Sequence, residues 1–379
     1  MREGQCPSLF FYDDMIINTQ LSHDAEYIGD IRENRVGIDR NNIDFVATLL
    51  TSSLYSKPLD SFLRETVSNA YDSHVEAGTE DPILLLIEKK KNYREYQISI
   101  RDYGIGLSPE RFDEIYKNIG SSTKRESNDY IGMFGIGRFS CLSCADTANI
   151  TSYYNGTKYS YIMYKNGGGI NIDKVGEVAG DFKNGLEVSI KKTVLYTSEW
   201  KSAINSLCLF DKLHVVFEGD DYSVSQIVEE FNKRVVHRFK TFVHCDLFFY
   251  KNHFKVGNVI YEADDSPVET NSIIIDLPMG TVDITPNREA LQYTSTTQNT
   301  ISSQAALVKK ELEELVKNEA DRKDHTIASL YNGFASRGEV CVYPDPDDKN
   351  YYLRVDTRDC HIDTSNVTIN GERIPKGYN

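Results

Sequence analysis

The sequence predicts an α+β protein in which helices cover one face of a β-sheet. Along residues 60–191, a helix is followed by a strand hairpin, a second helix, a glycine-rich loop, a third helix and several short alternating strands. This order is typical of a layered domain with its helices on one sheet face. A hydrophobic fraction of 40%, with 11% aromatic residues, is that of a folded protein rather than a disordered chain.

The totals restrict the kind of protein. With 379 residues, the chain is long enough for two or three domains. Its formal net charge of -15 disfavours non-specific binding to nucleic acid or to an anionic membrane. No run approaches the ~20 apolar residues that cross a bilayer, and the first residues lack the apolar core of a signal peptide. Seven scattered cysteines fit a reducing compartment, so we expect a cytoplasmic protein without a transmembrane segment.

The stretch from Asp60 to Gly78 predicts a helix that carries a buried polar site. Asp60 is the expected N-cap, and Gly78 is the expected residue after the last turn. Glu65, Asn69 and Asp72 fall at i, i+4 and i+7 and therefore share one face. A solvated surface face is the ordinary alternative. The mostly apolar flanking positions favour burial against something polar instead.

A strand hairpin and a second helix come next. Residues 82–88 and 93–102 are predicted as strands, joined by a lysine-containing turn at residues 89–92. Ser108 and Pro109 then mark a helix start, as the N-cap and the first helical residue.

Loops and short regular elements follow. Residues 120–130 are polar and lack any period, so we expect a mobile loop there. The glycines of residues 132–137 lead into a helix at residues 138–145. Short strands are predicted at residues 149–154, 158–164 and 186–191.

We divide the chain into three regions, residues 1–198, residues 199–320 and residues 321–379. The elements predicted in the second region are strands near residues 213–217, 247–250 and 273–277 and helices near residues 225–238 and 302–318. The third region has the pattern of short strands, and nothing in it predicts a function.

Four short motifs occur in a fixed order. They are Glu65-x-x-x-Asn69-Ala70-x-Asp72, Asp102-x-Gly104-x-Gly106, Gly120-Ser121-Ser122-Thr123-Lys124 and Gly132-x-x-Gly135-x-Gly137. Each motif alone is weak, because such turns and glycine runs are common. Together and in this order they resemble the GHKL ATPase superfamily of gyrase B subunits, ninety-kilodalton heat-shock chaperones, sensor histidine kinases and MutL.

That resemblance implies a Bergerat-type α/β sandwich that binds ATP with Mg²⁺, followed by a left-handed βαβ transducer domain. Asn69 offers an amide oxygen to Mg²⁺, a hard ion that also binds phosphate oxygens. Glu65, one turn earlier, is placed to orient or deprotonate the attacking water. Asp102 is suited to accept a hydrogen bond from the exocyclic amine of adenine.

The glycines suit close contact with a nucleotide. Gly104 and Gly106 let the backbone bend around the base, and the loop at residues 132–137 can point N–H groups at phosphates. The full set that the resemblance assigns to nucleotide binding is Asn69, Asp72, Asp102, Gly104, Gly106, Leu107, Asn118, Gly120, Ser121, Lys124, Gly132, Phe134, Gly135, Ile136, Gly137 and Arg138.

Two positions depart from the superfamily pattern. Leu186 stands where many members carry a threonine that supports the adenine-binding aspartate, so a water or Ser189 would have to substitute. Arg138 stands where the chaperones have an aromatic residue. It either reaches a phosphate or is a solvated charge at a helix start.

A further motif lies in the second region. The segment from Thr285 to Gln292 is similar to the middle-domain Arg-Glu-x-Leu-Gln segment of the chaperones, which implies that Arg288 reaches the γ-phosphate. A guanidinium that neutralises transition-state charge is a natural trigger for hydrolysis. The alternative is an ordinary Arg-Glu pair at a helix start.

A narrower resemblance covers roughly residues 40 to 300. Leu54-Tyr55-Ser56, Asn69-Ala70-Tyr71-Asp72-Ser73-His74 and Asp102-Tyr103-Gly104-Ile105-Gly106 look like the phage RIIA rapid-lysis proteins. This implies a phage or phage-related source, a host cytoplasm, and a protein partner of phage or host origin.

We therefore expect an ATPase that uses ATP to drive a nucleotide-dependent homodimer clamp. A histidine kinase is a rival, but residues 1 to 60 offer only His23 as phosphoacceptor, in a polar stretch. A nucleotide-gated inhibitor or adaptor without useful turnover is the second rival. His74 and the pair Cys141 and Cys144 are better explained as packed helix residues than as a base or a zinc site.

Overall fold

A computed structural model provides the structure. It describes residues 51, 53–89, 94–117, 136–166, 169–194, 196–248, 252–264, 267–268 and 273–319, and the short strands within residues 342–373.

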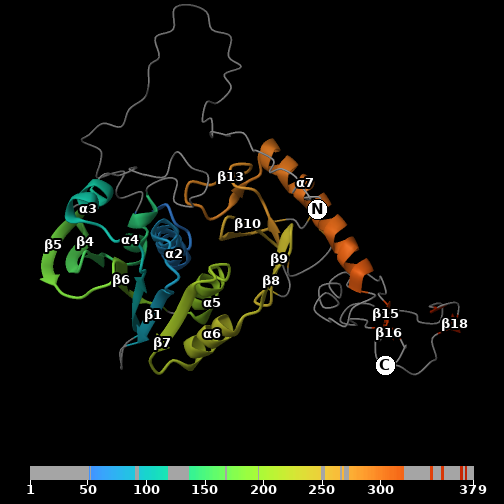
Figure 1. Ribbon diagram of the computed structural model, residues 1–379, viewed down its shortest axis with the longest axis horizontal. Coiled ribbons are helices and arrows are strands. Elements are labelled where there is room, and N and C mark those ends of the chain that lie inside the picture. The colour runs from blue at the N-terminus through green and yellow to red at the C-terminus, as the bar shows by residue number, and fades with distance from the viewer. Residues whose placement is uncertain are drawn as a thin grey trace, which may run out of the picture.

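A seven-stranded sheet organises the first unit, in the order β5-β4-β3-β6-β2-β1-β7 (Figure 1). Its strands are β1 (Ile83–Lys89), β2 (Glu95–Arg101), β3 (Thr147–Tyr154), β4 (Thr157–Asn166), β5 (Gly169–Ala179), β6 (Gly185–Thr193) and β7 (Leu213–Glu218). Neighbours are antiparallel except β1 and β7, which run parallel. The predicted hairpin and short strands are confirmed, whereas β5 was not predicted.

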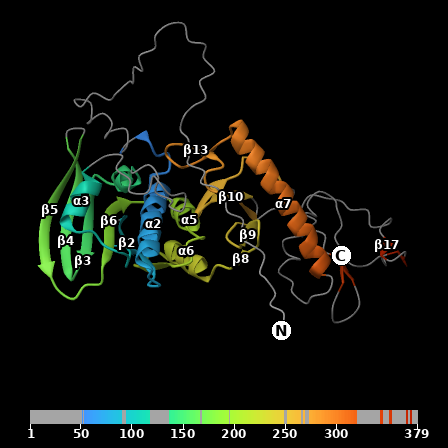
Figure 2. The ribbon, with the colours of Figure 1, turned by 45° about the horizontal axis from the view of Figure 1, so that its top comes forward.

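Helices form the second layer of this unit (Figure 2). They are α2 (Pro58–Ala77), α3 (Pro109–Tyr116), the 3-10 turn η3 (Gly137–Phe139), α4 (Cys141–Cys144), α5 (Thr197–Asn205) and α6 (Tyr222–Lys233). Helix α2 packs against β1, β2, β6, α4 and α5. The predicted α+β layering is therefore confirmed.

Helix α2 agrees with the helix predicted from the sequence, except at its N-terminal end. Phe62, Leu63 and Val67 are completely buried and fix the helix on the sheet. Gly78 ends it in the left-handed conformation, as predicted. Asp60 is not the N-cap, because Pro58 starts the helix two residues earlier; the Asp60 carboxylate accepts a hydrogen bond from Ser202 Oγ at 2.5 Å instead.

The other predicted helix starts agree in part. Ser108 Oγ accepts a hydrogen bond from Arg111 N, and Pro109 is the first residue of α3, as expected. The predicted helix at residues 138–145 is split into η3 and α4. Cys141 is buried in α4, and burial raises the pKa of the Cys144 thiol to about 12, which makes it unreactive.

A five-stranded sheet forms the second unit, in the order β11-β10-β12-β9-β8. Its elements are β8 (Val236–Arg238), β9 (Phe242–Cys245), β10 (His253–Val256), β11 (Val259–Glu262), β12 (Ile273–Asp276), the hairpin β13 (Asp283–Ile284) and β14 (Leu291–Gln292), and helix α7 (Ser295–Glu319). Farther along the chain, β15 (Val342–Pro344) pairs with β16 (Tyr351–Leu353) and β17 (Thr368–Ile369) with β18 (Glu372–Arg373).

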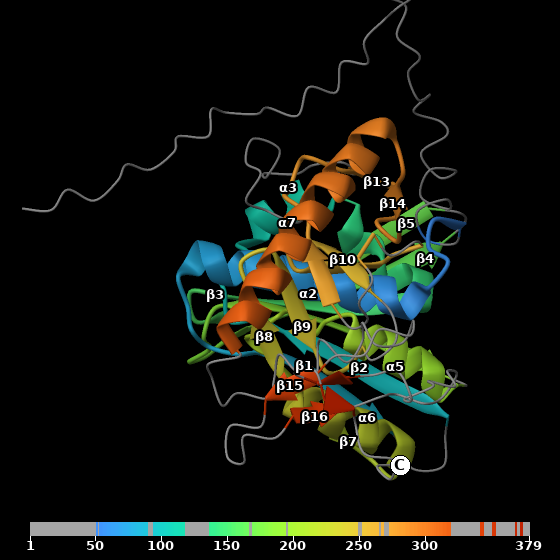
Figure 3. The same cartoon turned by 90° about the vertical axis from the view of Figure 1, so that its right-hand side faces the viewer.

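Helix α7 lies against this second sheet and contacts β12 (Figure 3). The carboxylate of Glu311 ties the helix to the β8–β9 turn by accepting hydrogen bonds from Lys240 N, Thr241 N and Thr241 Oγ1. Leu247 lies in a turn after β9 and Phe248 has no regular secondary structure, so the predicted strand at residues 247–250 is wrong where it is described. The left-handed βαβ hand of this unit stays a prediction.

The first layered unit extends beyond the expected boundary at residue 198. Strand β7 completes its sheet through the parallel pairing with β1, and α6 packs on β7 and α5. Parallel pairing between distant strands leaves no local sequence signal, which is why the boundary was placed too early. None of the helices in the described part of the chain has the length and apolar character needed to cross a membrane.

Candidate active site

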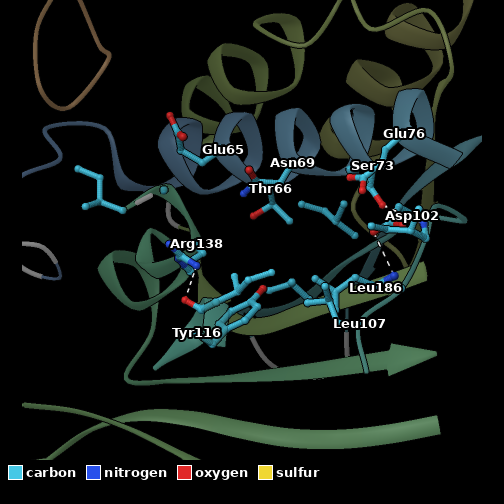
Figure 4. A pocket seen from close by; sticks show the side chains of 18 of the residues that line it. Glu65, Thr66, Asn69, Ser73, Glu76, Asp102, Leu107, Tyr116, Arg138 and Leu186 are labelled. Atoms are coloured by element: carbon cyan, nitrogen blue, oxygen red, sulfur yellow. Dashed lines mark hydrogen bonds between the residues drawn. The ribbon is translucent and has the colours of Figure 1, made fainter. Parts of the chain in front are cut away.

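One cavity of about 170 Å³ lies between α2, the end of β2, η3 and the β13–β14 loop. Glu65 and Asn69 project from α2 into the cavity, and Asp102 lies at the opposite end from Glu65, beside Leu186 (Figure 4). The lining residues are Tyr55, Glu65, Thr66, Asn69, Ala70, Ser73, Glu76, Ile100, Asp102, Ile105, Gly106, Leu107, Arg111, Ile115, Tyr116, Ile136, Gly137, Arg138, Leu186, Val188, Pro286, Asn287 and Arg288.

Helix α2 supplies the polar wall (Figure 4). Glu65, Asn69 and Asp102, expected to share a site, do line one cavity. Asp72 is buried but does not line it. Ser73, one turn after Asn69, lines the cavity instead.

Asp102 stands at the apolar end of the cavity, just after β2. Its carboxylate accepts hydrogen bonds from Gly104 N at 2.8 Å and from Leu186 N at 3.1 Å. Burial raises the pKa of Asp102 to about 6, against the lowering effect of these donors. A carboxylate offers about four acceptor positions, so capacity remains for a ligand. The backbone N–H of Leu186 thus supports Asp102, while the substitution of the missing threonine hydroxyl by a water or Ser189 stays a prediction.

Two α2 side chains that we did not assign to the site hold the Asp-x-Gly-x-Gly turn. Ser73 Oγ accepts a hydrogen bond from Ile105 N at 3.2 Å, and His74 Nε2 accepts one from Tyr103 N at 2.8 Å. His74 is 1% exposed, which confirms that it is a packed histidine, and burial lowers its pKa. The signal was their position one turn after Asn69.

At three positions only glycine fits, because neighbouring atoms lie where a Cβ would stand. A Cβ at Gly104 would overlap Ser73, and a Cβ at Gly137 would overlap the Glu65 carboxylate. Gly106 has a positive φ of 67°, and a Cβ there would overlap the Tyr153 carbonyl. A side chain at any of these three positions would therefore require its neighbours to shift, and two of the three, Gly106 and Gly137, line the cavity.

Leu107, Ile136 and Arg138 also line the cavity. Leu107 N donates a hydrogen bond to Ser152 Oγ at 2.8 Å, which anchors the end of the turn. The Arg138 guanidinium is half-buried and donates to the Ile115 carbonyl near the end of α3. It is therefore not a fully solvated helix-start charge. Its contact with phosphate stays a prediction.

Glu65 and Arg288 form a buried ion pair across the two units. Arg288 Nη1 lies 3.0 Å from Glu65 Oε2, and both side chains are at most 10% exposed. Arg64 Nε lies 3.5 Å from Glu65 Oε1 without the geometry of a hydrogen bond. Glu65 Oε1 is buried and accepts no hydrogen bond from the described residues.

Some predicted nucleotide contacts lie outside the described residues. They are Asn118, Gly120, Ser121, Lys124, Gly132, Phe134 and Gly135. Their roles stay predictions, and so does the mobile loop at residues 120–130.

Residues 55–168 match the family model described as Histidine kinase-, DNA gyrase B-, and HSP90-like ATPase. This segment is a GHKL-type domain. It contains both Glu65 and Asp102, whereas Arg288 lies beyond it. The match thus covers the acidic and amide walls of the cavity but not the loop that closes it.

Proteins similar to this chain include chaperones. The chaperone protein HtpG of Anaplasma marginale is 28% identical over 185 residues, covering 42% of this chain and 27% of HtpG. An endoplasmin homolog of Hordeum vulgare is 30% identical over 133 residues, covering 29% of this chain and 16% of that protein. The chain thus spans about a quarter or less of the length of these curated relatives.

A solved structure with a similar arrangement is the ATPase region of Saccharomyces cerevisiae topoisomerase II. The TM-score is 0.42 and the sequence identity is 10%. The aligned part covers 67% of this chain and 85% of the topoisomerase chain.

Proposed function

We propose that this chain binds MgATP in the cavity below α2 and hydrolyses it slowly. The observation that carries the proposal is the meeting of Glu65, Asn69 and Asp102 in one cavity, with an acceptor at its apolar end and a carboxylate at its other end. The test is an ATP-binding measurement beside a phosphate-release assay on the same purified protein.

The apolar end suits adenine. Asp102 keeps acceptor capacity beyond its bonds to Gly104 N and Leu186 N, and a purine amine is a matching donor. Ile100, two residues before Asp102 in the chain, and its strand partner Val188 also line the cavity and offer apolar contact. The carboxylate thereby recognises the base, while the apolar residues exclude water around it.

The other end suits phosphates and a metal. Glu65 Oε1 is a buried acceptor that receives no hydrogen bond from the described residues, and the Gly137 backbone closely approaches the other carboxylate oxygen, Oε2. The Asn69 amide would hold Mg²⁺, which keeps several waters and few protein ligands in such sites. When bound, Mg²⁺ neutralises charge on the phosphate oxygens. Glu65 would then orient a water and accept its proton.

Arg288 is proposed to stabilise the charge that develops on the γ-phosphate. Its guanidinium now pairs with Glu65, within reach of the same end of the cavity. Arg288→Ala is expected to reduce the rate of phosphate release about tenfold, because one charged donor is lost from the transition state. ATP affinity should change little. An unaltered rate would show that the ion pair between Arg288 and Glu65 has only a structural role.

ATP is further proposed to promote association of two chains, as the resemblance to GHKL clamps implies. Light scattering with and without a non-hydrolysable ATP analogue measures this directly. We expect the mass to double with the analogue and to stay monomeric with ADP. A mass independent of nucleotide would contradict the clamp.

A nucleotide-gated module without useful turnover is the second candidate. It is favoured by the Glu65–Arg288 ion pair, because Glu65 is the base that hydrolysis requires and its carboxylate is already paired with a guanidinium. ATP binding without phosphate release would support this candidate. The narrower phage RIIA likeness belongs with either candidate, since it predicts a protein partner of phage or host origin rather than a different chemistry.

A further inference from the structure

The loop between β13 and β14 is a closed turn that points at α2. Thr285 N donates to the Ala290 carbonyl at 3.0 Å, and Arg288 N donates to the Thr285 carbonyl at 2.7 Å. Arg288 has a positive φ of 55°, which is uncommon for a residue other than glycine. The loop therefore presents residues 287–289 in one defined arrangement.

All three of these residues contact α2. The Asn287 carbonyl accepts a hydrogen bond from Arg64 Nη2 at 3.1 Å. Arg288 pairs with Glu65, the next residue of the helix. Glu289 reaches the helix start, where it makes the largest number of these hydrogen bonds.

The Glu289 carboxylate is surrounded by neutral donors. Oε1 accepts from Ser56 N, Lys57 N and Ser61 Oγ, each at 3.0 Å. Oε2 accepts from Ser56 Oγ at 2.7 Å and from Asn287 Nδ2 at 2.8 Å. A negative charge is favoured here because these groups lie at the N-terminal end of α2.

Helix α2 has no N-terminal side-chain cap of its own. Lys57 makes no side-chain cap hydrogen bond, and Pro58 has no N–H to satisfy. Burial alone would raise the pKa of Glu289, but the N–H groups of Lys57 and Ser56 outweigh it and hold that pKa below its usual range. Glu289 is thus ionised at neutral pH, and it comes from the other unit of the protein.

We propose that Glu289 is a positioning residue, which docks the second unit onto the start of α2 and so holds Arg288 at Glu65. The docking part stands on the contacts alone, whereas the kinetic consequence rests on the proposed function. Because the two residues are adjacent in a closed loop, loss of the Glu289 contacts displaces the guanidinium. The loss in rate from this displacement is limited to the roughly tenfold loss expected when the Arg288 side chain is removed altogether.

Docking is tested by amide hydrogen exchange in Glu289→Gln and in a matched control, Glu311→Gln. Glu311 also binds two backbone N–H groups and a hydroxyl, but it lies entirely within the second unit. We expect exchange at Ser56 and Lys57 to accelerate at least about tenfold in Glu289→Gln, because a charged acceptor is lost. The control should leave these two amides unchanged. Unchanged exchange in Glu289→Gln would overturn the docking.

Positioning is tested by kinetics and a double variant. Glu289→Gln should lower kcat about tenfold and leave ATP affinity within about threefold, since Glu289 does not line the cavity. In an Arg288→Ala background the same change should cause no further loss. Faster exchange with an unchanged kcat, or an additive loss in the double variant, would overturn the positioning role. Failure of the wild-type chain to bind ATP would refute the proposed function and leave the exchange result to decide the docking.

Discussion

Replacement of Glu65 by alanine is expected to abolish ATP turnover while ATP binding persists. General-base catalysis contributes about 10²–10⁴-fold, so phosphate release should fall by roughly that factor. Binding should survive because Asp102 and the apolar wall are untouched. The measurement is single-turnover phosphate release together with calorimetric titration of ATP.

The alanine variant carries a structural cost that must be separated from catalysis. Removing Glu65 leaves the Arg288 guanidinium buried and without its carboxylate, which typically costs about 3–5 kcal/mol. Glu65→Gln keeps an oxygen that can accept from Arg288 but cannot take a proton, so it should fold better and remain inactive. A glutamine variant with wild-type turnover would show that Glu65 is not the base.

Local signals predicted the parts of the site that lie within one element. The spacing of Glu65 and Asn69 placed both on the cavity face of α2, and the turn after Asp102 was evident from its glycines. The same helical spacing selected Asp72 instead of Ser73. Asp72 lies seven residues after Glu65, and Ser73 lies four residues after Asn69, so helical spacing allows either residue on the cavity face. Only packing against the sheet shows which of the two faces the cavity.

Contacts between the units could not be predicted in this way. Glu289 lies more than 200 residues after Ser56 in the chain, and its role depends on which loop reaches the helix start. The resemblance to chaperones pointed to Arg288 as a phosphate contact. Its pairing with Glu65 required the three-dimensional arrangement, as did the support of Asp102 by the backbone of Leu186.

Asp102→Asn is expected to weaken ATP binding about 100-fold, with the loss confined to the adenine end. The amide replaces one acceptor oxygen by a donor, so a charged hydrogen bond worth up to about 3 kcal/mol is lost or opposed. Calorimetric titration measures the affinity. GTP, whose base carries a carbonyl at C6 where adenine carries its exocyclic amine, serves as the control ligand and should bind both proteins weakly.

The pH dependence of the unfolding free energy, compared between the wild type and Asp102→Asn, gives a second, independent readout. Because burial raises the pKa of Asp102 to about 6 in the folded protein, the carboxyl is protonated there at a pH where the unfolded chain is ionised. The contribution of Asp102 to stability is therefore fully present below its ordinary pKa and is lost as pH rises through about 6, by on the order of 3 kcal/mol. Relative to Asp102→Asn, the wild type should lose unfolding free energy over that window.

Binding should follow the opposite course, because only the ionised carboxylate is a pure acceptor for the adenine amine. The affinity for adenosine, which carries no titrating phosphate, should fall as pH drops through about 6 in the wild type and stay flat in Asp102→Asn. Equal adenosine affinities for the two proteins at pH 8 would remove Asp102 from base recognition. A ligand other than a nucleotide would then have to explain why Glu65, Asn69 and Asp102 line one cavity.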